Sequence, residues 1–94
     1  MAETKQKPFI EWIFVKKIFE IFILIKNKKP LIKIELSKKA DVTYDYLCKK
    51  LNDFLKIKVI YFEKKNNRAI YVLLTEKGKK LQYRLLEIKE ILKE

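Results

Sequence analysis

Apolar residues dominate the chain between Phe9 and Lys26, where no Gly, Pro, Asn or Ser interrupts them. Pro8 suits the first turn of a helix, so the pattern predicts one helix over residues 9–27, while the polar residues 1–8 are expected to be disordered. Apolar side chains nearly encircle this helix, although a surface helix needs only one apolar stripe. The helix is therefore either sunk in the core of its own domain or, as the small size of the chain favours, shared between that core and a dimer interface.

The chain then passes through a break, a short strand and a short helix. Asn27–Pro30 ends the first helix, because a residue that precedes proline avoids the helical conformation. Leu31 and Ile32 predict a very short strand. Residues 33–40 predict a short helix that carries apolar residues on one face.

A turn of three residues joins this short helix to the next one. Asp41 tolerates the left-handed conformation that such corners often require, and Thr43 is a good N-cap. Leu47, Leu51 and Phe54 are spaced four and three residues apart, which predicts a helix over 44–56 with these side chains buried. Two helices joined by so short a turn indicate a helix-turn-helix.

Two segments rich in β-branched and aromatic residues follow, at 59–63 and 69–75. They predict a short antiparallel hairpin with a basic tip over 64–68. Asn66 and Asn67 are expected to form its turn, because asparagine accepts positive φ.

Tyr61 and Tyr71 lie one on each of these segments. Aromatic residues on a sheet can stack on the bases of single-stranded nucleic acid. More often they form cross-strand core pairs, and we interpret these two tyrosines in that way.

The last segment predicts a helix over 76–93, capped by Thr75. Gly78, the one glycine of the chain, lies in its first turn. Leu81, Leu85, Ile88 and Leu92 follow at spacings of four, three and four residues, as in the seam of a coiled coil. We expect this helix and the helix over 9–27 to pair subunits.

The central motifs resemble a known family. The stretch ELSKKADVTYDYLCKKLNDFLKIKVI, residues 35–60, is similar to the helix-turn-helix of MarR-like and PadR-like regulators. The stretch YVLLTEKGKKL, residues 71–81, resembles the L-T-x-x-G run with which the wing of that family leads into its next helix. The resemblance implies an α+β, mostly helical winged helix-turn-helix: helix, short strand, helix-turn-helix, two-stranded wing and C-terminal helix. We expect one domain over 1–94, with the DNA-binding unit at 31–75.

This chain departs from the family pattern after the predicted recognition helix. Lys58 stands where the family usually has glycine, so it either adopts a strained left-handed conformation or the helix ends differently. The Lys/Ile-rich, His-free composition is similar to that of small proteins of this build from thermophilic archaea and their viruses or plasmids.

The chain carries a net charge of +11, which points to a polyanionic partner, either nucleic acid or an anionic membrane surface. The positive charge is spread along the whole chain, so it does not locate a site. Ile21–Ile25, the longest uncharged run within the apolar segment, is far too short to span a bilayer. We expect a cytoplasmic protein that does not bind to a membrane.

Cys48 is the one cysteine, and there is no histidine. A structural zinc site, an intrachain disulfide and a histidine base are therefore excluded, and the single thiol fits a reducing compartment. The sequence shows no carboxylate pair, nucleophile–base pair or phosphate loop. We expect no enzymatic activity, no cofactor and no metal.

The predicted site residues fall into three groups. With Leu47, Leu51 and Phe54 facing the core, the opposite face of the helix reads bases through Tyr44, Asp45, Cys48, Lys49 and Asn52. Phosphate contacts are expected from Lys38, Lys39, Thr43, Lys50, Lys64, Lys65 and Arg68. The expected dimer interface comprises Phe9, Trp12, Ile13, Phe19, Leu85, Ile88 and Leu92.

Two of these residues have alternative interpretations. Asp45 can accept a hydrogen bond from cytosine N4, or its negative charge can simply stabilise the helix by interacting with the positive end of the helix dipole. Cys48 can touch a thymine methyl, pack against neighbours or, with a lowered pKa, act as a reactive thiol.

The sequence thus predicts a homodimeric, sequence-specific repressor that binds a pseudo-palindromic duplex with helix 44–56 and the basic wing at 64–68. Two alternatives remain open. One is an architectural or partition-type protein that coats DNA with low specificity, and the other is a winged helix that binds a protein partner.

Overall fold

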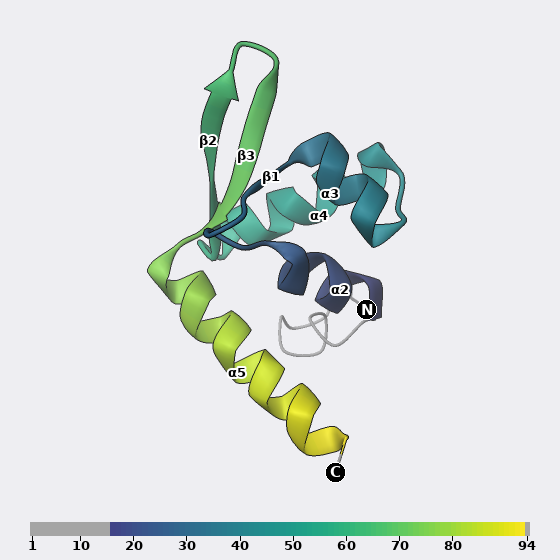
Figure 1. Cartoon of the computed structure of the whole chain (residues 1–94), viewed down its shortest axis with the longest axis vertical. Coiled ribbons are helices and arrows are strands. Elements are labelled where there is room, and N and C mark those ends of the chain that lie inside the picture. Colours follow the sequence, from purple (N-terminus) through teal and green to yellow (C-terminus); the bar gives the residue numbers. More distant parts are fainter. Residues whose placement is uncertain (1–15, 94) are drawn as a thin grey trace, which may run out of the picture.

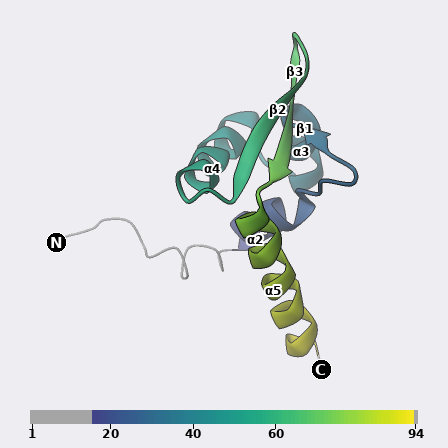
Figure 2. The same cartoon turned by 90° about the vertical axis from the view of Figure 1, so that its left-hand side faces the viewer.

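The computed structural model describes residues 16–93. The elements, in chain order, are α2 (Lys16–Leu24), β1 (Leu31–Ile32), α3 (Lys33–Ala40), α4 (Tyr44–Lys56), β2 (Ile60–Asn66), β3 (Ala69–Leu74) and α5 (Glu76–Leu92). The β2–β3 hairpin projects beyond α3 and α4 at one end of the molecule, and α5 extends beyond α2 at the other (Figures 1 and 2). The expected disorder of 1–8, the predicted helix start at Phe9 and the interface residues Phe9, Trp12 and Ile13 lie outside the described residues.

Helix α2 contributes one face to the hydrophobic core. Its buried face carries Ile18, Ile21 and Phe22, and the Phe22 ring lies 5.2 Å from the Phe54 ring of α4, measured between centroids. The helix ends at Leu24, before the predicted end at residue 27. Gln82 of α5 explains this early end, because its Nε2 donates to the carbonyl oxygens of residues 22 and 25 at 2.9 and 2.8 Å.

The helix-turn-helix forms as predicted. Asp41 adopts φ 57° and ψ 51°, and its N–H donates to a carbonyl oxygen in the last turn of α3. Thr43 caps α4, because its Oγ1 accepts from the N–H of Tyr46 at 3.1 Å. Leu47 and Leu51 are buried with Phe54, so the predicted stripe of α4 faces the core.

The three strands form an antiparallel sheet in the order β1-β3-β2. Leu31 of β1 lies opposite Val72 of β3, and Ile60 of β2 lies opposite Leu74. Val72, Leu74 and Ile60 are buried against the helices, so the base of the hairpin belongs to the core.

The hairpin is longer than expected, and its turn differs. Strand β2 continues to Asn66, and the turn residues are Asn67 and Arg68. Positive φ occurs only at Asp41 and Lys58 in the part of the chain that the structure describes, so the prediction of asparagines with positive φ was wrong. Instead, Oδ1 of Asn66 accepts from the N–H of Arg68 at 2.8 Å, an Asx turn that needs no left-handed residue.

The predicted core pair of tyrosines was also wrong. The register places Tyr61 opposite Leu73 and Tyr71 opposite Glu63, so the two tyrosines are diagonal neighbours on one face of the sheet. Tyr61 is 44% exposed and Tyr71 is half-buried, and neither tyrosine belongs to the hydrophobic core. The register decides this outcome, because a strand turns alternate residues to opposite faces.

The turn after α4 packs tightly on the start of α5. Lys58 has φ 63°, so the chain leaves α4 through a left-handed residue without glycine. A Cβ on Gly78 would lie 1.9 Å from the carbonyl oxygen of Val59, which explains why glycine stands there. Thr75 caps α5 through Gly78 N–H at 3.0 Å and donates to the Lys58 carbonyl oxygen at 2.7 Å. These elements form the predicted α+β, mostly helical winged helix-turn-helix.

Candidate nucleic-acid interface

The outer face of α4 carries the residues predicted to read bases. Tyr44, Asp45, Lys49 and Asn52 are exposed there, and Cys48 is half-buried. All five lie away from the buried stripe, because that stripe packs against α2, α3 and the sheet. The structure therefore brings the predicted base-reading set together on one helix face.

Asp45 and Lys49 form an ion pair on this face. The distance from Asp45 Oδ2 to Lys49 Nζ is 3.3 Å, and the side chains are 82% and 73% exposed respectively. The pair joins successive turns of α4, as expected for residues four apart. In the free protein, the positive charge of Lys49 is therefore offset by its neighbour.

Tyr44 lies at the N-terminal tip of the same face and is 47% exposed. Desolvation of its phenol raises the pKa above the ordinary value of 10.0, and the interaction with the neighbouring Cys48 side chain raises it further. The phenol therefore stays protonated at neutral pH.

The predicted phosphate contacts on the helices lie around this face. Lys38 and Lys39 are exposed in the last turn of α3, where the negative end of the helix dipole also stabilises a cation. Lys50 is half-buried, and its Nζ lies 5.2 Å from the centre of the Tyr46 ring. Thr43 is exposed and uses an oxygen lone pair for capping, so its hydroxyl proton remains available.

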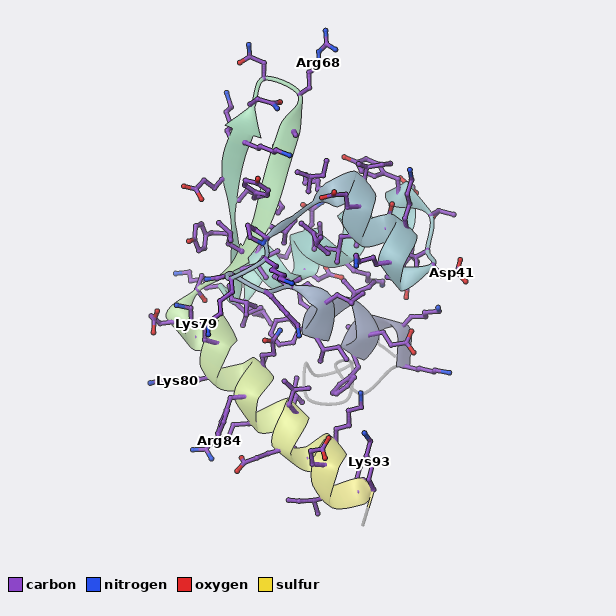
Figure 3. The ribbon with its side chains drawn as sticks, in the orientation of Figure 1. Asp41, Arg68, Lys79, Lys80, Arg84 and Lys93 are labelled. Atoms are coloured by element: carbon purple, nitrogen blue, oxygen red, sulfur yellow. The ribbon has the colours of Figure 1, made fainter. Side chains whose placement is uncertain are left out.

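The basic residues of the wing gather at its free end. Lys64 and Lys65 belong to β2 rather than to the turn, and both are exposed. Arg68 points outward from the apex of the hairpin (Figure 3). Lys65 lies at the irregularity in the β2 register. Its Nζ is 5.7 Å from the centre of the Tyr71 ring, so this ammonium group already has a partner within the protein. Arg68 and Lys64 are the more accessible cations.

Sequence reasoning missed Lys33, which joins α3 to the wing. Its Nζ lies 4.3 Å from the centre of the Phe62 ring of β2. A lysine at the first position of a helix opposes the helix dipole, so its presence there is a signal that a compensating partner exists. This contact links the first residue of α3 to strand β2 of the wing.

Two more positioning residues carried no periodic signal. Asn27 holds the end of β3, because its Oδ1 accepts from Leu74 N–H at 2.7 Å and its Nδ2 donates to the Leu74 carbonyl oxygen at 3.0 Å. Lys17 of α2 donates to the Ala40 carbonyl oxygen at 3.1 Å and thereby caps the C-terminus of α3. Lys17 thus links α2 to α3, and Asn27 links the segment after α2 to the base of the wing.

An apolar groove lies between α2 and α5, at the end of the molecule opposite the wing tip (Figure 1). Its volume is about 500 Å³. Phe19, Leu85, Ile88 and Leu92 all line it, so the described members of the predicted dimer interface lie together. Leu85 is buried, whereas Ile88 and Leu92 are 39% and 79% exposed.

The described residues show neither a metal centre nor a membrane span. Across residues 16–93, no three side chains of His, Cys, Asp or Glu lie close enough together to hold a metal ion. Within the same range, none of the helices has the length and apolar character needed to cross a membrane.

The chain is similar to solved structures, but it matches no family of known sequences. No protein-family model matches the sequence, and no curated protein matches it significantly. The crystal structure of AF1382 from Archaeoglobus fulgidus is similar at a TM-score of 0.79 and 21% identity, over 93% of this chain and 99% of that one. FabT of Streptococcus pneumoniae, solved in complex with DNA, is similar at a TM-score of 0.68 and 20% identity. That alignment covers 83% of this chain, which spans 55% of the FabT chain. These similarities establish the shared fold.

Proposed function

We propose that this protein is a transcriptional regulator that binds double-stranded DNA in a sequence-specific manner. The observation that carries the proposal is the exposed polar face of α4 beside a wing whose free end is basic. An α-helix fits the major groove of DNA, and the N-terminal residues of a recognition helix contact base edges. FabT, which shares the fold, was solved bound to DNA, and this supports the assignment.

The α2–α5 groove supports a homodimer. Three apolar residues on the last turns of α5 remain exposed among residues 16–93: Ile88, Ile91 and Leu92. A domain this small gains stability from a second copy. Two copies joined there would present two recognition helices to one duplex. With the helices about 34 Å apart, the site would be pseudo-palindromic, and occupancy of a promoter would repress transcription.

Selection of bound duplexes from a random library tests the function directly. We expect an enriched motif with two related half-sites, and an affinity that falls steeply with salt because phosphate contacts release counterions. If no duplex binds at micromolar protein, or if binding is insensitive to salt, the proposal fails.

Light scattering on the purified protein tests the dimer. We expect Ile88→Glu to yield monomers that bind the full site more weakly. The matched control is Tyr83→Glu, because Tyr83 is exposed on α5 but does not line the groove. A monomeric wild type would contradict the dimer and leave duplex binding to be judged by the selection.

The spread of positive charge along the chain favours a second candidate, an architectural protein that coats DNA. Competition between the selected duplex and a random duplex separates the two functions. A preference of a thousandfold or more, on the order expected for specific binding, supports the regulator, whereas equal affinities support the coat protein.

A further inference from the structure

The charges around α4 follow a pattern that bears on specificity. Exposed cations lie at the edges of the candidate interface, on the last turn of α3 and at the wing tip, whereas the first two turns of α4 hold the neutral Asp45–Lys49 pair. We propose that Asp45 and Lys49 act as one unit that reads a G·C base pair, and that Asp45 suppresses binding to DNA without that pair. This inference rests on the proposed function.

The geometry of the pair suits a base pair seen from the major groove. Both residues lie in the first two turns of α4, the part of a recognition helix that reaches base edges. The Asp45 Oδ2 and Lys49 Nζ atoms are 3.3 Å apart. Guanine O6 and cytosine N4 are joined by a hydrogen bond of about 2.9 Å, so the two protein groups can face the two base groups side by side.

The donors and acceptors then match in order. An ammonium has three donors, and Lys49 uses one of them on Asp45, which leaves two for the adjacent acceptors N7 and O6 of guanine. Asp45 can accept from the N4 amino group of cytosine. With adenine in the place of guanine, Lys49 would meet the N6 amino donor and Asp45 would meet the O4 acceptor of thymine, so both contacts are mismatched. With thymine in the place of guanine, the order of acceptor and donor is kept, but Lys49 finds one acceptor in place of two and is crowded by the thymine methyl group. The pair therefore favours G·C.

The same carboxylate gives the unit its selectivity. Asp45 is highly exposed, so it approaches the phosphates as soon as α4 enters the groove. Where cytosine N4 is present, a hydrogen bond offsets this repulsion. Where it is absent, the carboxylate is desolvated without a donor, and the complex is weakened. Lys49, already paired, adds little attraction to random DNA.

The test compares Asp45→Asn with wild type in two measurements. Duplex selection should show a G·C pair at one position of each wild-type half-site, and this preference alone should be relaxed in the variant. Fluorescence anisotropy should show that the ratio of affinities for selected and random duplex falls by about tenfold, near the lower end of one base contact. Binding to random duplex should tighten, and its salt dependence should grow by about one phosphate contact, because Lys49 is released.

Asp53→Asn is the matched control, because this substitution removes the same charge from the C-terminal half of α4. It should leave the motif unchanged and alter binding to random duplex less than Asp45→Asn does. Lys49→Gln provides a second variant and should lose the same G·C preference, but with weaker binding to every duplex. Circular dichroism melts establish that each variant is folded.

The outcomes separate the two levels of the proposal. If the wild type selects a motif and Asp45→Asn selects the same motif with unchanged affinity for random duplex, the inference is overturned and the proposed function stands. A fall in melting temperature without any change in base preference would assign Asp45 to the helix dipole alone and would also overturn it. If the wild type selects no motif, both the proposed function and the inference fail.

Discussion

The two corners that bound α4 achieve similar geometry by different means. Asp41, before the helix, and Lys58, after it, have φ of 57° and 63°, and both are exposed. At the first corner, the start of α4 is completed by a neighbour in sequence, because Thr43 caps it through a residue in its own first turn. A distant side chain, that of Lys17, reaches the end of α3 and not the start of α4. The second is completed by α5, through Thr75, Lys77 and Gly78, which contact residues 57–59.

This difference shows how the candidate recognition helix is held. Its start depends on local capping, which survives changes elsewhere in the fold. Its end depends on backbone groups of residues 57–59 that are bonded to, or in contact with, a distant helix. We therefore expect substitutions at the second corner to cost more stability than comparable substitutions at the first.

Gly78→Ala should have the largest effect. Alanine normally stabilises a helix relative to glycine by about 1 kcal/mol, but here its Cβ would meet the Val59 carbonyl oxygen at 1.9 Å. Because both groups belong to the backbone, α5 or the turn must shift, at a cost of about 3 kcal/mol. Urea unfolding measures the loss, with Lys80→Ala on the exposed side of α5 as the control. A stabilised Gly78→Ala variant would show that the second corner is not tightly packed.

Thr75→Ala comes next. The substitution removes the cap of α5 and the hydrogen bond to the Lys58 carbonyl oxygen together, so we expect a loss of about 2 kcal/mol in the free energy of unfolding. Thermal melts followed by circular dichroism measure it. Thr75→Ser, which keeps the hydroxyl, should recover most of the loss. Equal destabilisation by both substitutions would point to the lost methyl group instead.

Thr43→Ala should cost less, about 1 kcal/mol, because a single exposed capping bond is removed. The same melts, run beside Thr75→Ala, test the comparison between corners. A larger loss at residue 43 than at residue 75 would reverse it. Thr43→Asn should retain the cap and serve as the control.

Exchanging the left-handed residues for glycine should have the smallest effect and the opposite sign. Lys58→Gly should raise the free energy of unfolding by about 0.5 kcal/mol, because glycine avoids the left-handed penalty at some entropic cost. Asp41→Gly should gain less, since aspartate tolerates this conformation. Chemical denaturation compares the two variants. A greater gain at Asp41 would mean that the first corner is the more strained.

Much of the fold could be predicted from local signals. The bounds of α3 and α4 were confirmed, because Ala40, Asp41 and Thr43 mark a helix end, a left-handed corner and a cap within a few residues. The hairpin turn was not predicted correctly. Its two asparagines allow several turn types, and the register of the strands decides between them.

The candidate site divides in the same way. Periodicity alone identified the outer face of α4, since the buried Leu47, Leu51 and Phe54 determine which residues lie opposite. It could not identify Lys33 on Phe62 or the clamp of Asn27 on β3, because these contacts join residues distant in sequence.

By itself, then, the sequence determined the order of the elements, the cap and left-handed corner before α4, and which face of α4 is polar, because each depends on residues a few positions apart. Only the tertiary structure decided how far the wing extends, that Tyr61 faces solvent, and why glycine is required at 78 but not at 58. Those features depend on strand register and on the approach of α5 to the Val59 carbonyl oxygen. Such distances are set when segments far apart in the chain pack together.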